Sequence, residues 1–584
     1  MTSTQKPQRL KILLSYLRPH RTKVFLGIFA LLLVNGLGTY LPLLIGQVID
    51  DLQIAFSIEQ VQRYVLQFCL LASIMWVIRM ASRMWLFGAG RLVEFDIKQR
   101  IFEHLLRLEP SYFATHNAGD LINRATSDVE NIRRLVGFSI LSIANTAFAY
   151  ALRLPNMLNI DVSLTLATLA VYPIVMIVVN VFSHRLREQQ AAVQNALSEL
   201  SQLVQEDMSG MALIKIYAQE PMEQQAFEAR NQELLNAKVA LLKTRNILFP
   251  VVGGFASISL LVLLFFGGRA IANATITVGD FVSLLIYAQQ LIFPTAILGF
   301  TITAYQRGEV SIDRIEAILS VQPKVETQSN SISLPRTEVK GQLTARNLSF
   351  SYGQEVALNG VNFEIKPGEM VAVVGPIGSG KSTLANAIPR LLDISAGQLF
   401  VDDQDVTQLV LGDLRSAIAY VPQDSFLFST SLQNNIRYGV PNHEQTDVEN
   451  AAHQAQLHGD VLTFPKQYQT LVGERGVTLS GGQRQRTSLA RALILDAPIL
   501  ILDDALSSVD NQTATKILQE LAQQQKTVIF ISHQMSAAAI CDRILVMDHG
   551  TIVQEGPHAD LIEKPGLYQS LWNKQKLEAN LNQA

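Results

Sequence analysis

Long runs of apolar residues, separated by polar segments, dominate the first half of the chain and are missing from the second half. A helix needs about 20 such residues to cross the ~30 Å hydrocarbon core of a membrane. The six runs that are long enough fall at residues 24–48, 61–88, 138–158, 162–182, 248–272 and 281–305. The pattern therefore predicts an α-helical membrane domain of six transmembrane helices over residues 1–320.

Two polar segments between these runs are unusually long, at residues 90–136 and 183–243, and both keep the apolar spacing of an amphipathic helix. The transmembrane helices are therefore expected to continue beyond the bilayer as long cytosolic extensions. Each extension contains a break in the pattern, at residues 111–121 and 209–217. A helix pair that protrudes, turns and returns is suited to push on a soluble domain; the alternative is a pair of ordinary amphipathic loops.

The N-terminal segment, residues 1–23, has six basic residues and no acidic one, and its leucines form a short apolar stripe. This combination is typical of a helix that lies on the inner leaflet of a membrane. The short loops on the opposite side are acidic, with Asp50, Asp161 and Asp280 among them. The positive-inside rule then places the N-terminus and the second half of the chain in the cytosol. A cleaved signal peptide is the competing interpretation, but the first apolar run is longer than a signal-peptide core.

The chain is 48% hydrophobic and carries a net charge of −3. No stripe of Lys and Arg offers a basic surface, so nucleic acid is excluded as a partner. The two cysteines, Cys69 and Cys541, lack the spacing of a zinc site and are too few for a disulfide framework. Both are predicted to be buried structural thiols.

The second half is predicted to be a soluble α/β domain over residues 343–573, preceded by a polar linker at 321–342 and followed by a tail at 574–584. Its strand Val371–Val374 leads into a glycine-rich loop and an apolar helix extending to Leu391, the setting of a phosphate-binding P-loop. Glycines let backbone N–H groups surround the phosphates of a nucleotide, a lysine reaches the β and γ oxygens, and a serine ligates Mg²⁺. The loop residues are Gly375, Gly378, Ser379, Gly380, Lys381, Ser382 and Thr383.

A second strand, Ile499–Leu502, ends in two carboxylates, Asp503 and Asp504. Four apolar β-formers in a row indicate a buried parallel strand, and α/β sheets bind ligands at the carboxyl ends of such strands. Asp503 is the expected carboxylate on the Mg²⁺ side, and the residue after it is expected to act as a general base toward the attacking water. Without other motifs, two acidic residues after an apolar strand would more often be solvent-exposed residues at the strand end. The phosphate loop upstream favours a role for them in the nucleotide site.

A further anion site is predicted at the start of the apolar helix that follows Leu479, because helix starts present free backbone N–H groups. Its residues are Ser480, Gly481, Gly482 and Gln483. This loop lies about 100 residues from the phosphate loop, with a helical excursion between them. The simplest arrangement is a head-to-tail pair of domains, in which each such loop covers the phosphate loop of the other domain.

Two further residues complete the set: Gln423 follows Tyr420-Val421-Pro422, and His533 follows an apolar strand. Together these motifs occur in the order and spacing of a known family. The chain resembles an ABC exporter half-transporter, and the resemblance covers essentially its whole length. It implies an α-helical membrane domain followed by an α/β P-loop nucleotide-binding domain with a helical subdomain, in the inner membrane of a bacterium.

The same resemblance implies that ATP hydrolysis drives the export of an amphiphilic substrate, drug-like or lipid-like. It implies ATP and Mg²⁺ as ligands, membrane lipid around the helices, and a second half-transporter as partner. The breaks near Gly119–Leu121 and Gly210–Tyr217 resemble the coupling helices through which the nucleotide-binding domains of the family move the membrane helices.

Roles for single residues also follow from the resemblance. Tyr352 is implied to stack on adenine, Gln423 to contact Mg²⁺ and the attacking water, and His533 to hold the γ-phosphate. The implied catalytic group is Asp504, His533 and Gln423, and the implied Mg²⁺ ligands are Ser382, Gln423 and Asp503.

One position departs from the pattern of the family, because Asp504 stands where a glutamate is usual. Aspartate and glutamate have similar pKa values, so the difference is the reach of about 1.5 Å that one methylene gives a general base. The substitution resembles the degenerate member of a heterodimeric exporter, so a heterodimer is favoured, with slow hydrolysis at the site on this chain's own phosphate loop. Two alternatives stay open: a homodimer in which Asp504 recruits water differently, and an ATP-binding regulatory subunit that gates a competent partner.

Three arginines, Arg79, Arg83 and Arg153, fall within or near the ends of predicted spans. Charged residues inside a membrane are often functional, and facing a cavity these would suit an anionic amphiphile such as a lipid or an acidic drug. The alternative is that each extends to the lipid headgroups or pairs with a helix end. We favour this alternative for each of the three.

Overall fold

The computed structural model describes residues 6–54, 57–328 and 330–581, and it divides into two compact units. The helical unit spans Met1–Leu106 and Asn117–Val321, and the α/β unit spans Arg107–His116 and Gln322–Ala584. Three parts of the predictions lie outside the described residues: residues 1–5 of the interfacial helix, Ser329 of the linker and residues 582–584 of the tail.

Within its described residues, the helical unit has six helices that are long and apolar enough to span a membrane, which confirms the predicted class of this half. The fourth of these is interrupted between Leu169 and Tyr172, where Pro173 occupies the first turn of the next helix, a position that tolerates proline. Two π-helical turns, Arg124–Asp128 and Leu135–Ser139, join three shorter helices into the third span. The helices of the unit are α1 (Lys6–Leu17), α2 (Arg21–Ile54), α3 (Ile58–Leu105), α5 (Ala118–Asn123), α6 (Val129–Arg134), α7 (Ile140–Ile160), α8 (Val162–Leu169), α9 (Tyr172–Ile216), α10 (Glu220–Ala272) and α11 (Val278–Leu319).

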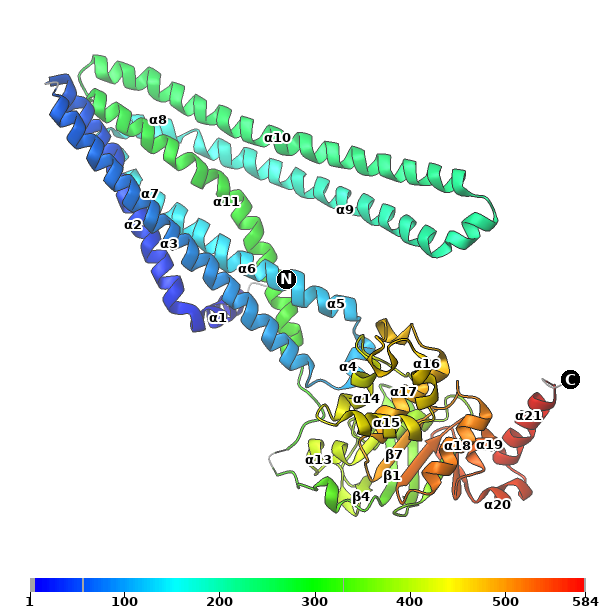
Figure 1. The fold of residues 1–584 in the computed structure, drawn as a ribbon. Helices are drawn as coiled ribbons and strands as arrows, with labels where there is room; N and C mark the ends of the chain where they lie inside the picture. The colour runs from blue at the N-terminus through cyan, green and yellow to red at the C-terminus, as the bar shows by residue number, and fades with distance from the viewer. Residues whose placement is uncertain (1–5, 55–56, 329, 582–584) are drawn as a thin grey trace. The chain divides into compact units, whose positions relative to one another are not determined.

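The extensions of α9 and α10 beyond their apolar segments lie side by side (Figure 1). A turn of only three residues, Tyr217–Gln219, joins them, and Ala218 adopts a left-handed conformation with φ 53°. Ser209 and Gly210 remain inside α9, so the break is much shorter than the interval of residues 209–217 expected from the sequence.

The first extension is interrupted where α3 ends at Leu105. Residues 107–116 belong to the α/β unit and contain the short helix α4 (Pro110–Thr115). The carboxylate of Glu109, which precedes α4, accepts a hydrogen bond of 3.3 Å from the backbone N–H of Lys324 in the same unit. Gly119–Leu121 lies in α5 of the helical unit. The short helix α4, which overlaps the predicted break at residues 111–121, therefore belongs to the α/β unit, and the coupling role expected near Gly119–Leu121 stays a prediction.

Glycines allow two spans of the helical unit to touch through their backbones. A Cβ atom at Gly279 of α11 would lie 2.1 Å from the carbonyl oxygen of Gly46 in α2. In the same place the carboxylate of Asp50 accepts a hydrogen bond of 2.8 Å from the N–H of Gly279. Small residues commonly permit such close approaches in membrane helices, where packing contacts replace the hydrophobic effect as the driving force for association.

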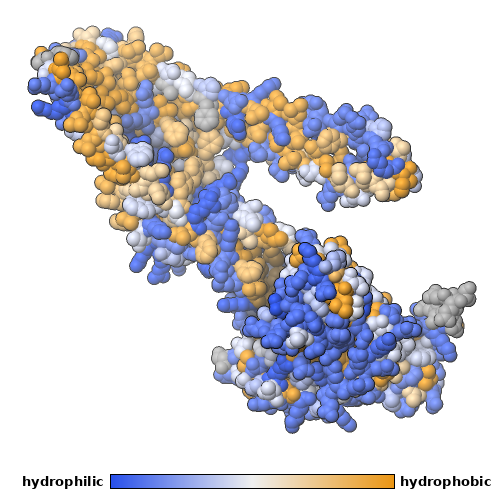
Figure 2. All heavy atoms as spheres, viewed as in Figure 1, coloured by the Kyte–Doolittle hydropathy of each residue, from blue (hydrophilic) through white to orange (hydrophobic). Residues whose placement is uncertain are grey.

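The outer surface of the helical unit is largely hydrophobic along the spans in the view of Figure 2, whereas the visible surface of the α/β unit is mostly hydrophilic. Large apolar side chains such as Trp76 and Phe265 are 68% and 69% exposed, as expected where lipid is the solvent. Cys69 is also exposed, so the prediction that it is buried is wrong: it lies on this outer apolar face of α3 and not in the core. Cys541 is buried as predicted.

The α/β unit contains two sheets, with strand orders β2-β1-β4-β5 and β10-β9-β3-β8-β7-β6. The larger sheet is parallel from β9 to β6, with β10 antiparallel at its edge. The strands are β1 (Leu343–Tyr352), β2 (Glu355–Ile365), β3 (Met370–Val374), β4 (Leu399–Val401), β5 (Gln404–Asp405), β6 (Ile418–Val421), β7 (Ile499–Asp503), β8 (Thr527–Ile531), β9 (Arg543–Asp548) and β10 (Thr551–Gly556).

Helices cover the larger sheet, and one continuous apolar core joins it to the helical excursion between β6 and β7. Beyond α4, the helices of the unit are α12 (Lys381–Ala387), α13 (Leu411–Ser416), α14 (Leu432–Ile436), α15 (Gln445–Gln454), α16 (His458–Thr463), α17 (Gly481–Leu493), α18 (Asn511–Ala522), α19 (Met535–Ala538), α20 (His558–Glu563) and α21 (Leu567–Leu581). The helix α12 ends four residues before Leu391, the end expected from the apolar pattern.

The strand β7 is buried along its whole length and pairs in parallel with β6 on one side and β8 on the other. The prediction of a buried parallel strand ending at Asp503 is therefore confirmed. Since β3 and β8 are also parallel neighbours, the phosphate loop, the two aspartates and His533 all follow strands at the same edge of the sheet.

Candidate functional site

A cavity of about 520 Å³ lies at this edge and gathers the candidate residues from five separate stretches of the chain. We call it the nucleotide cavity. Its walls come from the end of β1, the start of β2, the phosphate loop, the segment after β6, the end of β7, and the end of β8 with the segment that follows it. The predicted residues that line it are Tyr352, Gly378, Ser379, Gly380, Lys381, Ser382, Thr383, Gln423, Asp503, Asp504 and His533.

The glycines of the phosphate loop are required by its backbone. Gly375, Gly378 and Gly380 have φ values of 151°, 82° and 96°, which only glycine adopts readily. A Cβ atom at Gly375 would lie 2.1 Å from the carbonyl oxygen of Met547, and one at Gly380 would lie 2.5 Å from that of Ala357. The tight loop therefore depends on glycine for both conformation and space, and its backbone N–H groups are available to a phosphate.

Lys381 is held by the loop that it follows. Its Nζ donates hydrogen bonds to the carbonyl oxygens of Gly375 and Pro376, at 3.0 and 2.7 Å, and to Oγ of Ser379 at 3.2 Å. Burial lowers the pKa of Lys381, whereas the nearby carboxylates of Asp503 and Asp504 act in the opposite direction. The ammonium group is thus positioned in the cavity by three oxygen atoms of its own loop.

Asp503 is almost fully buried and makes two polar contacts. Its Oδ1 accepts a hydrogen bond of 3.1 Å from Oγ of Ser382, and its Oδ2 lies 3.5 Å from the hydroxyl of Tyr420, which donates to Asn386 at 3.0 Å. Burial raises the pKa of Asp503; the Ser382 hydrogen bond opposes this shift and the Asp504 charge adds to it. The contact of Tyr420 with this carboxylate is not evident from the sequence, where Tyr420 serves only to locate Gln423.

Replacing Asp503 with Asn is expected to stabilise the nucleotide-free protein at neutral pH. A raised pKa means that the folded state stabilises the protonated carboxyl, and this contribution is lost as the pH rises through the folded-state pKa. Removing the buried charge should raise the melting temperature by about 2–4 °C, the shift for about 1 kcal/mol in a domain of this size. Thermal unfolding at pH 7 and near pH 4 measures this, and the gain should vanish at the lower pH. An equal gain at both values would contradict the assignment of the effect to ionisation.

The oxygen atoms around Asp503 fit a small hard cation. The hydroxyl of Ser382 and the carboxylate of Asp503 are 3.1 Å apart, and Gln423 lines the same cavity. Mg²⁺ is usually held by one or two carboxylates together with nucleotide phosphates, and not by a full cage of protein ligands. The described residues include no group of three or more His, Cys, Asp or Glu that could hold a metal ion.

Asp504 occupies a turn that continues from β7. Its φ of 48° is left-handed, its N–H donates to the carbonyl oxygen of Ile531 at 2.9 Å, and its own carbonyl oxygen accepts from Oγ of Ser507 at 3.0 Å. Burial raises the pKa of Asp504, and the nearby His533 opposes that shift. The backbone thus fixes Asp504 beside His533, and a longer side chain would extend farther from the same anchored position.

Ser480 caps the N-terminus of α17 through a reciprocal pair of contacts. Its Oγ accepts a hydrogen bond of 3.3 Å from the N–H of Gln483, and the Gln483 side chain accepts one of 3.1 Å from the N–H of Ser480. A Cβ atom at Gly482 would lie 2.9 Å from the carbonyl oxygen of Ser508, so this loop packs against the turn after Asp504. Gln485, which the sequence analysis did not select, bonds Ser507 and the N–H of Ser508, at 2.8 and 2.7 Å.

Among the described residues, those from Ser480 to Gln483 are absent from the walls of the nucleotide cavity. Gly481 instead lines a neighbouring cleft of about 400 Å³ together with Gln423 and Asp504. Gln423 and Asp504 therefore face both hollows, and the structure brings the predicted loop near the base position without placing it over the phosphate loop of the same chain.

The helical unit contains a separate cavity of about 540 Å³ that Arg79, Arg83 and Arg153 line; we call it the arginine cavity. Arg153 is only 8% exposed, and it donates to Gln290 from Nε at 2.8 Å and to Asn35 from Nη1 at 3.0 Å. The favoured expectation, that each arginine extends away to headgroups or a helix end, is therefore wrong for Arg153; for Arg79 and Arg83, which are exposed, it stays a prediction. Facing polar groups on α2 and α11 hold Arg153 inside the bundle instead.

Two family models match the chain, one for each half. The model of the ABC transporter transmembrane region matches residues 24–295, and the model described as ABC transporter matches residues 358–507. The second match contains the phosphate loop, Gln423, the Ser480 loop and both aspartates.

Curated relatives match along almost the entire chain. The multidrug resistance-like ATP-binding protein MdlA of Escherichia coli is 35% identical, covering 99% of this chain and 98% of that protein. The ATP-dependent lipid A-core flippase of Syntrophus aciditrophicus is 30% identical, covering 97% and 94%. A solved structure of a bacterial Atm1-family ABC exporter with ATP bound has a TM-score of 0.77 at 25% identity, covering 95% of this chain and 99% of that one. The chain therefore belongs to the ABC transporter family, as an exporter half-transporter whose nucleotide-binding domain binds ATP and couples its hydrolysis to transport.

Proposed function

We propose that this exporter moves anionic amphiphiles from the cytosolic side of a bacterial inner membrane. The observation that carries the proposal is the arginine cavity, whose described lining contains three guanidinium groups and no carboxylate. Its remaining walls include the aromatic side chains of Phe87, Phe138 and Phe293. Guanidinium groups pair well with carboxylate and phosphate, and apolar walls suit hydrocarbon, so one ligand with both parts would satisfy the site. The multidrug and lipid flippase names of the relatives support an amphiphilic cargo.

In the nucleotide cavity, Tyr352 supplies an aromatic face for adenine, Lys381 supplies a positive group for the β and γ oxygens, and His533 supplies a ring N–H for the γ-phosphate. Ser382, Gln423 and Asp503 are the proposed Mg²⁺ ligands, supported by the 3.1 Å contact between the first and the last of them. Bound Mg²⁺ would neutralise charge on the phosphates. Gln423 and Asp504 are the proposed residues for orienting the attacking water, and the lining of both hollows by these two residues supports this role.

The working assembly is proposed to be a dimer, because the Ser480–Gln483 loop is absent from the described walls of its own chain's nucleotide cavity. A second half-transporter would bring its equivalent loop over this phosphate loop and receive this loop in return. The shorter base at Asp504 favours a heterodimer, in which hydrolysis at this chain's own phosphate loop is slow. A homodimer is the alternative, and the charge distribution of the loops supports a cytosolic N-terminus in either case.

The cargo proposal predicts a charge-selective loss of transport in the double variant Arg79→Gln, Arg83→Gln. These two side chains have no ion pair among the described residues, so their replacement leaves no buried partner exposed. In vesicles of neutral lipid, ATP-dependent movement of a fluorescent phosphatidylglycerol should slow about fivefold, equivalent to about 1 kcal/mol. A cationic probe with the same acyl chains should move at least as fast as in the unmodified protein.

The matched control is Arg153→Lys, which keeps the charge while losing the fork-shaped contacts to Asn35 and Gln290. It should retain the preference for the anionic probe even if its rate falls. Equal slowing of both probes in the double variant would overturn the proposal of an anionic cargo. Arg79 and Arg83 would then have only a general role in helix packing.

A further inference from the structure

A second hollow of the helical unit, about 310 Å³ in volume, is lined by four arginines, one each from α6, α9, α10 and α11: Arg134, Arg187, Arg245 and Arg307. We call it the basic pocket. No carboxylate is present among its described lining residues, and it shares no lining residue with the arginine cavity. It is therefore a distinct concentration of positive charge.

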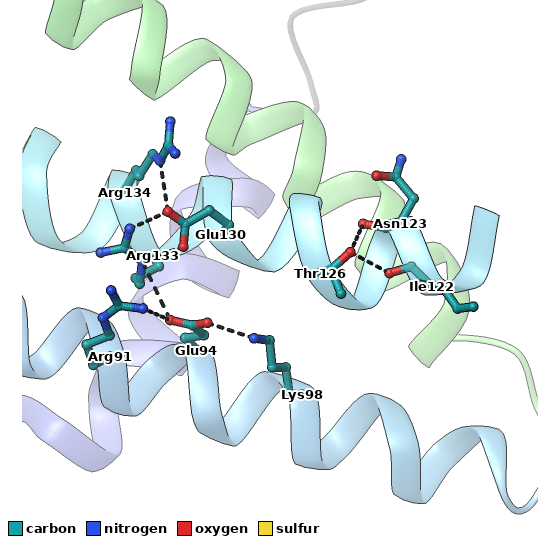
Figure 3. A network of polar contacts seen from close by, with 9 residues as sticks. All are labelled: Arg91, Glu94, Lys98, Ile122, Asn123, Thr126, Glu130, Arg133 and Arg134. Carbon is teal, nitrogen blue, oxygen red and sulfur yellow. Dashed lines mark hydrogen bonds and ion pairs between the residues drawn. The ribbon is translucent and has the colours of Figure 1, made fainter. Parts of the chain in front are cut away.

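Only one of the four guanidinium groups is neutralised within the described part of the chain. Arg134 donates from Nε to Glu130 at 3.0 Å, in the network drawn in Figure 3, where Glu130 also pairs with Arg133. Arg187 donates to the hydroxyl of Thr303 at 2.8 Å, which holds the guanidinium against α11 without cancelling its charge. Over the described residues, Arg187, Arg245 and Arg307 have no ion-pair partner. Three like charges gathered in one hollow repel one another unless an anion joins them.

A residue with an unsatisfied hydroxyl, Ser183, lines the same hollow. Ser183 is 5% exposed, and its Oγ is a buried atom without a hydrogen-bond partner in the described structure. Buried polar groups almost always have a partner, and leaving one without it costs about 1–3 kcal/mol. A ligand with acceptor oxygens would satisfy this hydroxyl and the three unpaired guanidinium groups together.

The position of the basic pocket along the helices indicates what such a ligand is attached to. Ser183 and Arg187 come directly after the predicted span that ends at residue 182, Arg245 precedes the span that begins at 248, and Arg307 follows the span that ends at 305. All therefore lie at the ends of spans that lead into the long extensions. With the cytosolic orientation proposed above, this level is that of the headgroups of the inner leaflet. Leu186, Leu241 and Phe300 add apolar walls.

We propose that the basic pocket binds the phosphate-bearing headgroup of an anionic amphiphile of the inner leaflet. Phosphate oxygens accept hydrogen bonds from Arg187, Arg245 and Arg307 and from the Ser183 hydroxyl, and the first carbons of the acyl chains contact the apolar walls. The inference rests on the proposed orientation, but not on the proposed cargo, because the site is separate from the arginine cavity.

The test is lipid binding to the purified full-length chain, measured by native mass spectrometry after release from nanodiscs of phosphatidylcholine with a minor fraction of phosphatidylglycerol. The triple variant Arg187→Gln, Arg245→Gln, Arg307→Gln should bind phosphatidylglycerol at least about tenfold more weakly than the unmodified chain. Its matched control is Arg185→Gln, an exposed arginine on the same helix that does not line the pocket, which should change binding less than twofold. Equal losses in both variants would overturn the site.

A single substitution tests the same proposal if the triple variant does not fold. Ser183→Ala removes a buried hydroxyl that has no partner, so thermal stability without anionic lipid should not fall, while the stabilisation by phosphatidylglycerol should decrease. Unchanged stabilisation would count against the proposal.

Inorganic phosphate added at millimolar concentration distinguishes the source of the headgroup. If phosphate does not displace the lipid, the result supports an amphiphile as the ligand. If phosphate alone raises the thermal stability as much as the lipid does, the lipid proposal is overturned in favour of a soluble anion. None of these measurements uses ATP or transport, so their failure leaves the exporter proposal standing. Conversely, the Arg79→Gln, Arg83→Gln variant should bind lipid here normally.

Discussion

Replacing Asp504 with Glu is expected to raise ATP turnover at this chain's own phosphate loop about 10- to 100-fold. General-base catalysis is worth about 10²–10⁴-fold, and it requires the carboxylate to be within hydrogen-bond reach of the water. The backbone of Asp504 is fixed by its contacts with Ile531 and Ser507, so it cannot move forward to make up for the missing methylene. The nucleotide cavity has room for the longer side chain. Phosphate release by the purified protein under saturating ATP and Mg²⁺ measures the effect.

The control for this experiment is Asp504→Asn, which keeps the size of the side chain and removes its basicity. If Asp504 is too short to act, this variant should retain nearly all of the low starting turnover. Turnover that is already high in a pure homodimer, unaffected by Asp504→Glu and abolished by Asp504→Asn, would contradict the degenerate-site interpretation. That outcome would establish Asp504 as the working base.

Lys381→Ala is expected to lower ATP turnover about 10²- to 10³-fold and to weaken nucleotide binding. Removing one pre-positioned donor from a developing charge typically has an effect of this size. Here the donor is held by oxygen atoms of Gly375, Pro376 and Ser379, so water cannot easily restore the same geometry. Binding of a fluorescent ATP analogue and phosphate release are the two measurements.

Lys366→Ala provides the comparison, because Lys366 is an exposed lysine of the same unit and does not line the nucleotide cavity. Its turnover should stay within about twofold of the unmodified protein. Comparable losses in the two variants, or normal turnover in Lys381→Ala, would contradict the role proposed for Lys381.

Local pattern was sufficient for much of the nucleotide site. The strand β7 was predictable because four β-forming apolar residues precede an acid, and the phosphate loop because glycine, lysine and serine occur at fixed spacing after a strand. A site whose residues come from one short segment can be recognised from the spacing of residues within that segment. The packing of Tyr420 against Asp503 depends on two strands brought together by folding, and no local spacing specifies it.

The helical unit was less predictable for a related reason. Hydropathy indicates that a residue lies within a span, but it does not indicate which neighbours it meets. Arg153 is inside the bundle because Asn35 and Gln290, distant in sequence, face it from other helices. Cys69 is exposed because no helix among the described residues covers its side of α3, although its immediate sequence is equally apolar.

The assignment of α4 to the α/β unit bears on how this protein can be divided for experiment. A soluble fragment that begins at Gln322 would lose residues 107–116, a native part of that folded body, and with them the contact of Glu109 with Lys324. Such a fragment would expose backbone and side chains that are normally covered, and a stability measured on it would underestimate that of the intact domain. Adding residues 107–116 as a separate peptide should restore part of the lost stability, because the peptide can bind at the position that it occupies in the intact protein.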